Sequence, residues 1–272
     1  MARAVLRLQE FHYNVRYSGD CLFEGDDLLH KCDAEMNGIR GKQISIAFQD
    51  PLSYLNPLQT VRSQMREVLF QHMACDSTSA DLLIQEVLTE MQFANPKEVM
   101  LKYPFQMSGG MRQRVIIGMA LLTKPSLLIA DEITASLDAR VEREVLDCID
   151  RLRHKQNMAV LLISHNLSVI ERYADRIAFL YAGTLVEMMP KGDALPHHPY
   201  SRALLNCSKL GDREVGFPFI EPAPVELEKS KDGCPFRHRG CSRMMDICHT
   251  STPDLRELPN SLARCHNPIM TT

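Results

Sequence analysis

Two short segments of the sequence combine residue types that suit the handling of a phosphate group. The first is Met-Ser-Gly-Gly-Met-Arg-Gln-Arg, residues 107–114, where two glycines open an apolar helical stretch. Unpaired N–H groups at a helix N-terminus attract anions, and glycine lets the backbone approach a phosphate closely. Ser108 adds a hydroxyl donor beside Gly109 and Gly110. Taken alone, the segment also fits an ordinary turn before a helix.

The second segment is an apolar run, Leu127 to Ala130, that ends in Asp131 and Glu132. A continuous apolar run of this kind is typical of a buried strand in a parallel sheet. An aspartate at the carboxyl end of such a strand suits Mg²⁺, and the glutamate after it can activate a water molecule. Two acids also occur at ordinary strand ends, so this segment is ambiguous by itself.

A complete phosphate site of this type needs a third component, the loop G-x-x-x-x-G-K-[ST]. Its backbone N–H groups and lysine hold the phosphates, and its hydroxyl holds Mg²⁺. The pattern does not occur in residues 1–272. The nearest fragment, Gly41-Lys42-Gln43, lacks the upstream glycine and the hydroxyl residue.

Other polar residues follow apolar runs in the same way. Gln49 follows the run 44–48, and His165 comes two residues after the run 159–163. Asp138 closes the short loop after Glu132 and precedes a helical stretch, where capping of that helix is the plain alternative.

The elements that must position these residues alternate along the chain. Apolar spacing predicts helices over 61–70, 80–92, 111–122 and 139–154, strands over 44–48, 127–130 and 159–163, and a hairpin over 177–187. Such alternation is typical of an α/β sheet with functional residues at strand ends. From residue 188 onward, prolines and cysteines mark a separate extension.

The composition excludes several classes of protein. A hydrophobic content of 45% supports a real core, and a net charge of −3 gives no electrostatic case for nucleic acid as a partner. The longest apolar run covers 115–122, far short of the roughly 20 residues that cross a bilayer. We therefore expect a soluble chain whose membrane role depends on partners.

Four of the cysteines lie close together, in the order Cys234-x6-Cys241-x6-Cys248-x16-Cys265. Four thiolates suit a zinc ion or an iron–sulfur cluster, and clustering in a reducing compartment favours metal over disulfides. No C-x-x-C pair is present, which weakens a zinc-finger interpretation. On chemistry alone, zinc, iron–sulfur and no metal all stay open.

The combination and order of these features, over about residues 20–190, resemble the ATP-binding subunit of ABC transporters. The resemblance assigns Gln49 to the Q-loop, Ser108, Gly109 and Gly110 to the signature motif, Asp131 to Walker B, Glu132 to the catalytic base, Asp138 to the D-loop and His165 to the switch histidine. It implies a P-loop NTPase-like (ABC ATPase) parallel sheet core, ATP and Mg²⁺ as cofactors, and a helical subdomain over about 55–110 that docks membrane subunits.

The chain departs from the family pattern in three places. The Walker A loop is missing, Ile133 stands where proline is usual, and Met107 stands where leucine is usual. Only the missing loop bears on function, because it carries most nucleotide binding. We therefore expect an N-terminally truncated domain that is inactive in isolation but offers Ser108–Gly110 to ATP bound by a second ABC ATPase subunit, in a heterodimer. A mis-started or truncated copy of a full-length subunit is the alternative.

The C-terminal region limits the resemblance to one branch of the family. His198-Pro199-Tyr200-Ser201-Arg202, Gly233-Cys234-Pro235-Phe236 and Cys265-His266-Asn267-Pro268 resemble the extension of dipeptide and oligopeptide permease ATPases, a branch that includes nickel importers. Some members carry a [4Fe-4S] cluster there. The resemblance thus implies Cys234, Cys241, Cys248 and Cys265 as ligands, with zinc as the runner-up.

We accordingly interpret 1–187 as a partial ABC ATPase domain and 188–272 as the extension. The resemblance implies ATP hydrolysis at the cytoplasmic face of the inner membrane, where the chain would be peripheral and would energise a peptide or nickel importer. Two membrane permease subunits would be its partners and, through them, an extracytoplasmic solute-binding protein. A catalytically silent subunit and a non-transport DNA-repair ATPase are the alternatives, although we expect no nucleic acid partner.

Overall fold

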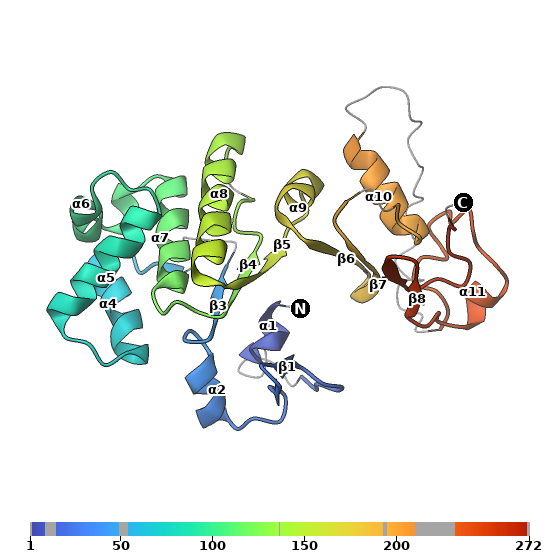
Figure 1. Ribbon diagram of the computed structural model, residues 1–272, viewed down its shortest axis with the longest axis horizontal. Helices are drawn as coiled ribbons and strands as arrows, with labels where there is room; N and C mark the ends of the chain where they lie inside the picture. The colour runs from blue at the N-terminus through green and yellow to red at the C-terminus, as the bar shows by residue number, and fades with distance from the viewer. Residues whose placement is uncertain are drawn as a thin grey trace. The chain divides into compact units, whose positions relative to one another are not determined.

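The computed structural model describes residues 2–8, 15–48, 54–135, 137–192, 195–209 and 232–270. It divides into two compact units, residues 1–165 and 166–272, which are described separately (Figure 1).

A parallel sheet forms the centre of the first unit. Its strands are β3 (Ile44–Ala47), β4 (Leu127–Asp131) and β5 (Ala159–Ile163), in the order β3-β4-β5. Leu127 pairs with Ile44 on one side and with Ala159 on the other, so the three strands run in register. Their carboxyl ends therefore meet at one edge, as the predicted α/β sheet requires.

Side chains of β4 alternate between two apolar clusters, as the period of a strand dictates. Ile129 belongs to the cluster formed with α1 (Ala2–Val5), the short hairpin β1 (Leu22–Phe23) and β2 (Asp26–Asp27), and α2 (Asp33–Ile39). Leu128 and Ala130 belong to the larger cluster on the opposite face, which the remaining helices of the unit build. The sheet is thus covered on both faces around β4.

Helices α4 (Val61–His72), α5 (Ser77–Glu90) and α6 (Pro96–Leu101) lie between β3 and β4 in the sequence, followed by the 3-10 turn η2 (Pro104–Gln106). Each of these three helices begins at a residue whose side chain accepts a backbone N–H, namely Thr60, Asp76 and Asn95. These helices fall within about 55–110, where the resemblance predicts a helical subdomain, and the subdomain itself stays a prediction.

Helix α7 (Gly109–Leu121) lies between this helical group and α8 (Ala139–Gln156), as Figure 1 shows. Two glycines permit the close packing. A Cβ atom on Gly118 would lie 3.2 Å from Val87 of α5, and one on Gly110 would lie 2.9 Å from Val141 of α8.

The second unit contains α9 (Leu167–Tyr173), β6 (Arg176–Tyr181), β7 (Thr184–Pro190), α10 (Pro199–Lys209), α11 (Ile247–Thr250), β8 (Arg256–Leu258) and β9 (Ser261–Ala263). Its antiparallel sheet has the order β6-β7-β9-β8. The predicted hairpin around Gly183 is confirmed as β6 and β7.

The structural division after His165 differs from the predicted boundary at 187/188. The reason is strand pairing, because Glu187 of β7 pairs with Ala263 of β9 and joins the hairpin to the extension in one sheet. The predicted boundary follows the family pattern and stays a prediction. Within the described residues, every helix is too short or too polar to span a bilayer.

Candidate functional site

The structure brings Glu132 and His165 together at the carboxyl edge of the parallel sheet. His165 Nδ1 lies 3.5 Å from Glu132 Oε1, and the Glu132 N–H donates to the Ile163 carbonyl at 3.0 Å. Glu132 has a φ of 49°, in the left-handed region that non-glycine residues rarely adopt. Asp131 occupies the last position of β4, directly before this turn.

The contact between Glu132 and His165 contributes little to stability. The His165 side chain is 71% exposed and that of Glu132 is 31% exposed, and solvent screens such pairs to well under about 1 kcal/mol. Both groups therefore remain open to a ligand or a water molecule at the sheet edge.

The loop after Glu132 is held by two hydrogen bonds near its start. The Ala135 N–H donates to the Glu132 carbonyl, and Thr134 Oγ1 donates to Glu142 Oε1 of α8 at 2.7 Å. Ile133, which replaces the usual proline, is 1% exposed and belongs to the large apolar cluster. The loop between the catalytic candidates and α8 is thus anchored by a buried side chain and a hydroxyl.

The Ser-Gly-Gly segment begins α7, as predicted. Ser108 Oγ accepts the Met111 N–H at 3.3 Å and so caps the helix. Asp138 caps α8 by accepting the N–H groups of Arg140 and Val141, each at 3.0 Å. Both residues therefore serve the plain capping role, which is compatible with a further role in binding a phosphate.

The close approach of Gly110 to Val141 places the start of α7 against the first turn of α8. The signature segment and the loop that ends at Asp138 are therefore neighbours within this chain. Gln49, another residue of the predicted constellation, lies outside the described residues.

Two polar residues that support this region, Thr134 and Glu142, were not singled out by sequence reasoning, and a third, Gln113, appeared there only as part of the Ser-Gly-Gly-x-x-Gln-Arg segment. Thr134 and Glu142 form the clamp on the loop, and their spacing matches no binding motif. Gln113 is fully buried, and neither polar atom of its amide has a hydrogen-bond partner. It follows Gly110 by three residues and so lies on the same side of α7. Only its burial distinguishes it, and burial is not visible in the motif.

The four C-terminal cysteines are free thiols in the second unit. Cys234 and Cys248 are buried around Phe236, with Cys241 partly buried beside them. Burial raises the pKa of Cys265 to about 11, an effect to which the charges of the other three thiols add. The four sulfurs are therefore close enough to influence one another.

The thiols do not form a ready ligand set. Among the described residues, no group of three or more His, Cys, Asp or Glu side chains is arranged to hold a metal ion. The donor chemistry suits a soft metal, but the arrangement does not match a metal site. The predicted role of these cysteines is not supported by the structure and stays a prediction.

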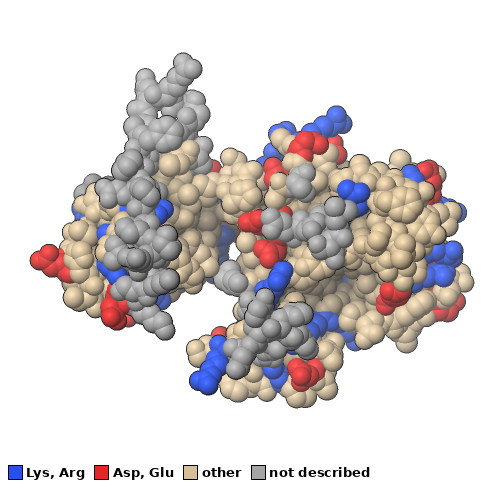
Figure 2. All heavy atoms as spheres, turned by 180° about the vertical axis from the view of Figure 1, so that it is seen from behind, with Lys and Arg blue, Asp and Glu red and all other residues tan. Residues whose placement is uncertain are grey.

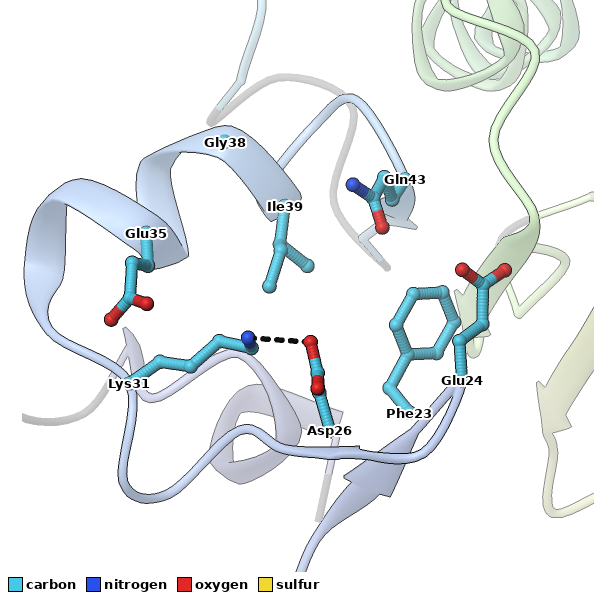
Figure 3. Close-up of a pocket in the computed structure, with 8 residues that line it drawn as sticks. All are labelled: Phe23, Glu24, Asp26, Lys31, Glu35, Gly38, Ile39 and Gln43. Atoms are coloured by element: carbon cyan, nitrogen blue, oxygen red, sulfur yellow. Dashed lines mark hydrogen bonds and ion pairs between the residues drawn. The ribbon is translucent and has the colours of Figure 1, made fainter.

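A polar pocket of about 220 Å³ lies between the β1–β2 turn and α2 (Figure 3). The Lys31 Nζ atom points across it to Asp26 Oδ2 at 2.7 Å, while Phe23 and Ile39 provide apolar lining. None of the predicted site residues lines this pocket, and we assign it no part in the site.

Charges of both signs are mixed on the surface. On the face that Figure 2 presents, lysine and arginine side chains alternate with aspartate and glutamate and with uncharged surface. The described residues on that face form no continuous basic stripe.

Comparison with known proteins points to the same family as the sequence motifs. The family model described as ABC transporter matches residues 7–135. The dipeptide transport ATP-binding protein DppD of Bacillus subtilis is 38% identical over 86% of this chain and 71% of its own length. The oligopeptide transport ATP-binding protein OppD of Salmonella typhimurium is 36% identical over 94% of this chain and 77% of its own length.

Solved structures agree on the fold. A dimeric structure of MJ0796, a bacterial ABC transporter cassette, matches with a TM-score of 0.58 at 24% identity, covering 65% of this chain and 75% of the cassette. Its post-hydrolysis dimer bound to ADP and Pi matches with a TM-score of 0.56, covering 63% of this chain and 73% of the cassette. With its parallel sheet, its strand-end acids and relatives at this level of identity, the chain belongs to the ABC transporter family of ATP-binding proteins.

Proposed function

We propose that this chain is the ATP-binding subunit of an ABC importer for peptides and that it couples ATP hydrolysis to transport through a membrane permease. The observation that carries the proposal is the meeting of Glu132 and His165 beside Asp131 at the carboxyl edge of the sheet. The relatives whose names refer to dipeptide and oligopeptide transport support peptides as the substrate class. Nickel is the alternative solute.

Each strand-end group has a role that suits its chemistry. Asp131 would hold Mg²⁺, because hard cations prefer carboxylate oxygens. Glu132 would orient and activate the attacking water, and His165, which is exposed beside it, would contact the γ-phosphate. Gln49, which follows the sequence of β3, would contribute as the Q-loop residue of the family pattern. ATP and Mg²⁺ are thus the proposed cofactors.

The signature segment would act on a partner's nucleotide. Ser108, Gly109 and Gly110 present the N-terminus of the 13-residue helix α7, where the helix dipole and free N–H groups favour a phosphate. Residues 1–272 contain no G-x-x-x-x-G-K-[ST] loop. We therefore propose a heterodimer in which a second ABC ATPase subunit holds the ATP and this chain completes its site. A chain that completes the site without hydrolysing ATP itself is the silent-subunit version of this proposal.

The experiment mixes the purified chain with a second subunit that carries a complete phosphate loop and measures ATP hydrolysis. The Ser108→Arg variant places a long cation where the phosphate would lie, and we expect it to abolish most of the activity of the mixture. Thr78→Arg is the control for the added charge, since Thr78 is exposed in the first turn of α5 and its replacement puts the same unfavourable positive charge at a helix N-terminus. Equal hydrolysis rates for the two variants would refute the proposal.

The isolated chain gives a second readout. Equilibrium dialysis against Mg²⁺ and ATP should show no measurable binding by the chain alone. Tight binding by the isolated chain would show that it holds nucleotide without the partner, and the shared-site proposal would fail.

The helical region over 54–106 is the proposed contact with the permease. Several of its apolar side chains face solvent, including Leu58 at 85%, Phe105 at 69%, Leu101 at 65% and Leu82 at 63% exposure. Such side chains suit burial against a partner. In this arrangement the chain is peripheral at the cytoplasmic face of the inner membrane and contacts two permease subunits. The solute-binding protein would communicate with it only through them.

We propose separately that Cys234, Cys241, Cys248 and Cys265 hold a [4Fe-4S] cluster, with zinc as the runner-up. Their proximity and free thiols support the idea, although their present arrangement is not that of ligands. The group would have a structural role, because ATP hydrolysis needs no electron transfer. Anaerobic purification should give a brown protein with broad absorption near about 400 nm. A colourless protein with stoichiometric zinc would assign zinc, and a metal-free protein would rule out both.

A further inference from the structure

Two adjacent histidines precede α10, and both are buried: His197 is 4% exposed and His198 is 1% exposed. His198 Nδ1 accepts the Tyr200 N–H at 3.1 Å, and its ring packs edge-on against Phe236. Burial lowers the pKa of His198 to about 4, so this ring is neutral at ordinary pH. His197 has a different set of partners.

Both ring nitrogens of His197 face carbonyl oxygens. Nδ1 lies 3.0 Å from the Ile269 carbonyl, and Nε2 lies 3.0 Å from the Pro259 carbonyl in the β8–β9 turn. A neutral imidazole has one N–H donor and one acceptor nitrogen, so it can donate to only one of these carbonyls. The lone pair of the acceptor nitrogen would then point at a lone pair of the other carbonyl oxygen, which is unfavourable. Only the imidazolium donates to both.

A buried carboxylate lies beside this ring and lacks a cation. Glu187 of β7 has no exposed surface, and its two oxygens accept the N–H groups of His197 at 2.7 Å and His198 at 3.1 Å. In the described part of the chain, Glu187 has no ion pair with lysine or arginine. A buried charge is costly unless an opposite charge offsets it, and a protonated His197 supplies that charge nearby.

The same histidine also holds the C-terminal segment through its backbone, because the Ile269 N–H donates to the His197 carbonyl at 2.8 Å. We propose that protonated His197 is a pH-sensitive clamp that fastens the 264–270 segment and the β8–β9 turn to β7. Proton uptake and docking of the segment then favour each other.

Other charged or titratable groups on the packed elements have partners of their own. These are Arg202 with the Pro196 carbonyl, Arg256 with the Cys265 carbonyl, Arg264 with the Leu185 and Pro253 carbonyls, and His266 with the Ser251 carbonyl. The Glu257 side chain is exposed to solvent. His198 opposes docking only when it becomes charged, at acid pH. Any histidine can change its charge between about pH 6.5 and about pH 8.5, and His266 lies on the docked segment itself, so the His197→Gln variant serves to identify the contribution of His197.

The direction of the pH dependence follows from the number of N–H donors on the His197 ring. At the lower pH the ring donates to both carbonyls and the segment is docked. As the pH rises, loss of the proton leaves one of the two carbonyls facing a ring nitrogen that cannot donate to it. The loss of one such hydrogen bond costs on the order of a factor of ten in the docking equilibrium.

Hydrogen exchange across this pH window tests the clamp on the intact chain. After correction for the intrinsic rate, the Ile269 amide of the wild type should lose about tenfold protection between the two pH values. In His197→Gln, whose amide donates at only one end and does not titrate, protection should be low and independent of pH. His154→Gln, an exposed site on α8, is the matched control and should follow the wild type.

Nitrogen NMR of the wild-type histidine rings provides a readout that does not depend on a variant. Two protonated ring nitrogens on His197 at about pH 6.5 are expected. A neutral His197 ring in the docked protein, or the same pH profile of exchange in His197→Gln and wild type, would overturn the proposal.

Discussion

Gly110→Ala tests the packing that sets the signature segment against α8. An added Cβ would lie 2.9 Å from Val141 Cγ1, closer than real Cβ contacts, whereas a Cβ on Gly109 would meet no atom within 4 Å. Val141 is β-branched and sits in a helix, so its χ1 angle has little freedom to turn the methyl away. The two glycines are adjacent and differ mainly in this contact, which makes Gly109→Ala the matched control.

The expected change in the free energy of unfolding of Gly110→Ala is the balance of a steric cost and an entropic gain. Overpacking a side chain of this kind costs about 1–3 kcal/mol. Replacing a helical glycine by alanine gains about 0.5–1 kcal/mol in backbone entropy. We therefore expect Gly110→Ala to lower the free energy of unfolding by roughly 0.5–2 kcal/mol. Gly109→Ala should be neutral or slightly stabilising.

Urea denaturation followed by far-UV circular dichroism measures both variants. Val141→Ala provides the second half of a double-mutant cycle, because removal of the methyl makes room for the new Cβ. The combined Gly110→Ala and Val141→Ala variant should be more stable than the sum of the single changes predicts, by about 1 kcal/mol. Equal effects of the two glycine changes, or a coupling energy of zero, would refute the packing argument.

Two further predictions concern polar contacts of the first unit. Hydrogen bonds from Arg62, and to a smaller extent from Arg66, lower the pKa of Asp81. The ionised Asp81 therefore stabilises the fold above the usual carboxyl pKa, and this contribution is lost as the pH falls through the lowered pKa. Asp81→Asn should thus cost about 1 kcal/mol near pH 7, and in urea titrations the gap to wild type should close as the pH falls through the lowered pKa of Asp81. A gap that is independent of pH would contradict this. Thr134→Val removes the 2.7 Å bond to Glu142 and should cost about 1 kcal/mol by the same assay, whereas Thr134→Ser should retain most of the stability. Equal losses for the valine and serine variants would show that the hydroxyl contributes nothing.

Sequence reasoning succeeds where the signal is local. The runs that became β3, β4 and β5 are continuous and apolar, and helices α4, α5, α7 and α8 were each predicted to within a few residues. Parallel pairing then aligns the strand ends, and the meeting of Glu132 and His165 follows from that alignment. This part of the site was therefore predictable from sequence.

The first 40 residues show where local signals fail. Helix α1 has four residues, and strands β1 and β2 have two each, which is too short for a period to appear. Their positions depend on contacts of Leu28 and Met36 with sheet residues that are distant in sequence. Such tertiary contacts have no counterpart in the spacing of the apolar residues.

The surroundings of His197 could not be predicted for a different reason. Glu187 appears in the sequence as a polar residue late in a hairpin strand, where exposure is the ordinary expectation. Glu187 is nevertheless buried in the folded chain, where β9 pairs with β7 and places Ala263 opposite it. The difference of 76 positions between the two paired residues hides the contact from any local pattern.

The backbone at Glu132 implies a compromise between stability and activity. A left-handed φ of 49° costs an ordinary side chain about 1 kcal/mol, a cost that glycine does not have and asparagine has to a smaller extent. Position 132 would therefore be more stable with either residue, but neither can accept a proton from water. If the chain were evolved in the laboratory for thermal resistance alone, this position would be among the first to lose its carboxylate, and the proposed water-activating group would disappear while the fold became more robust.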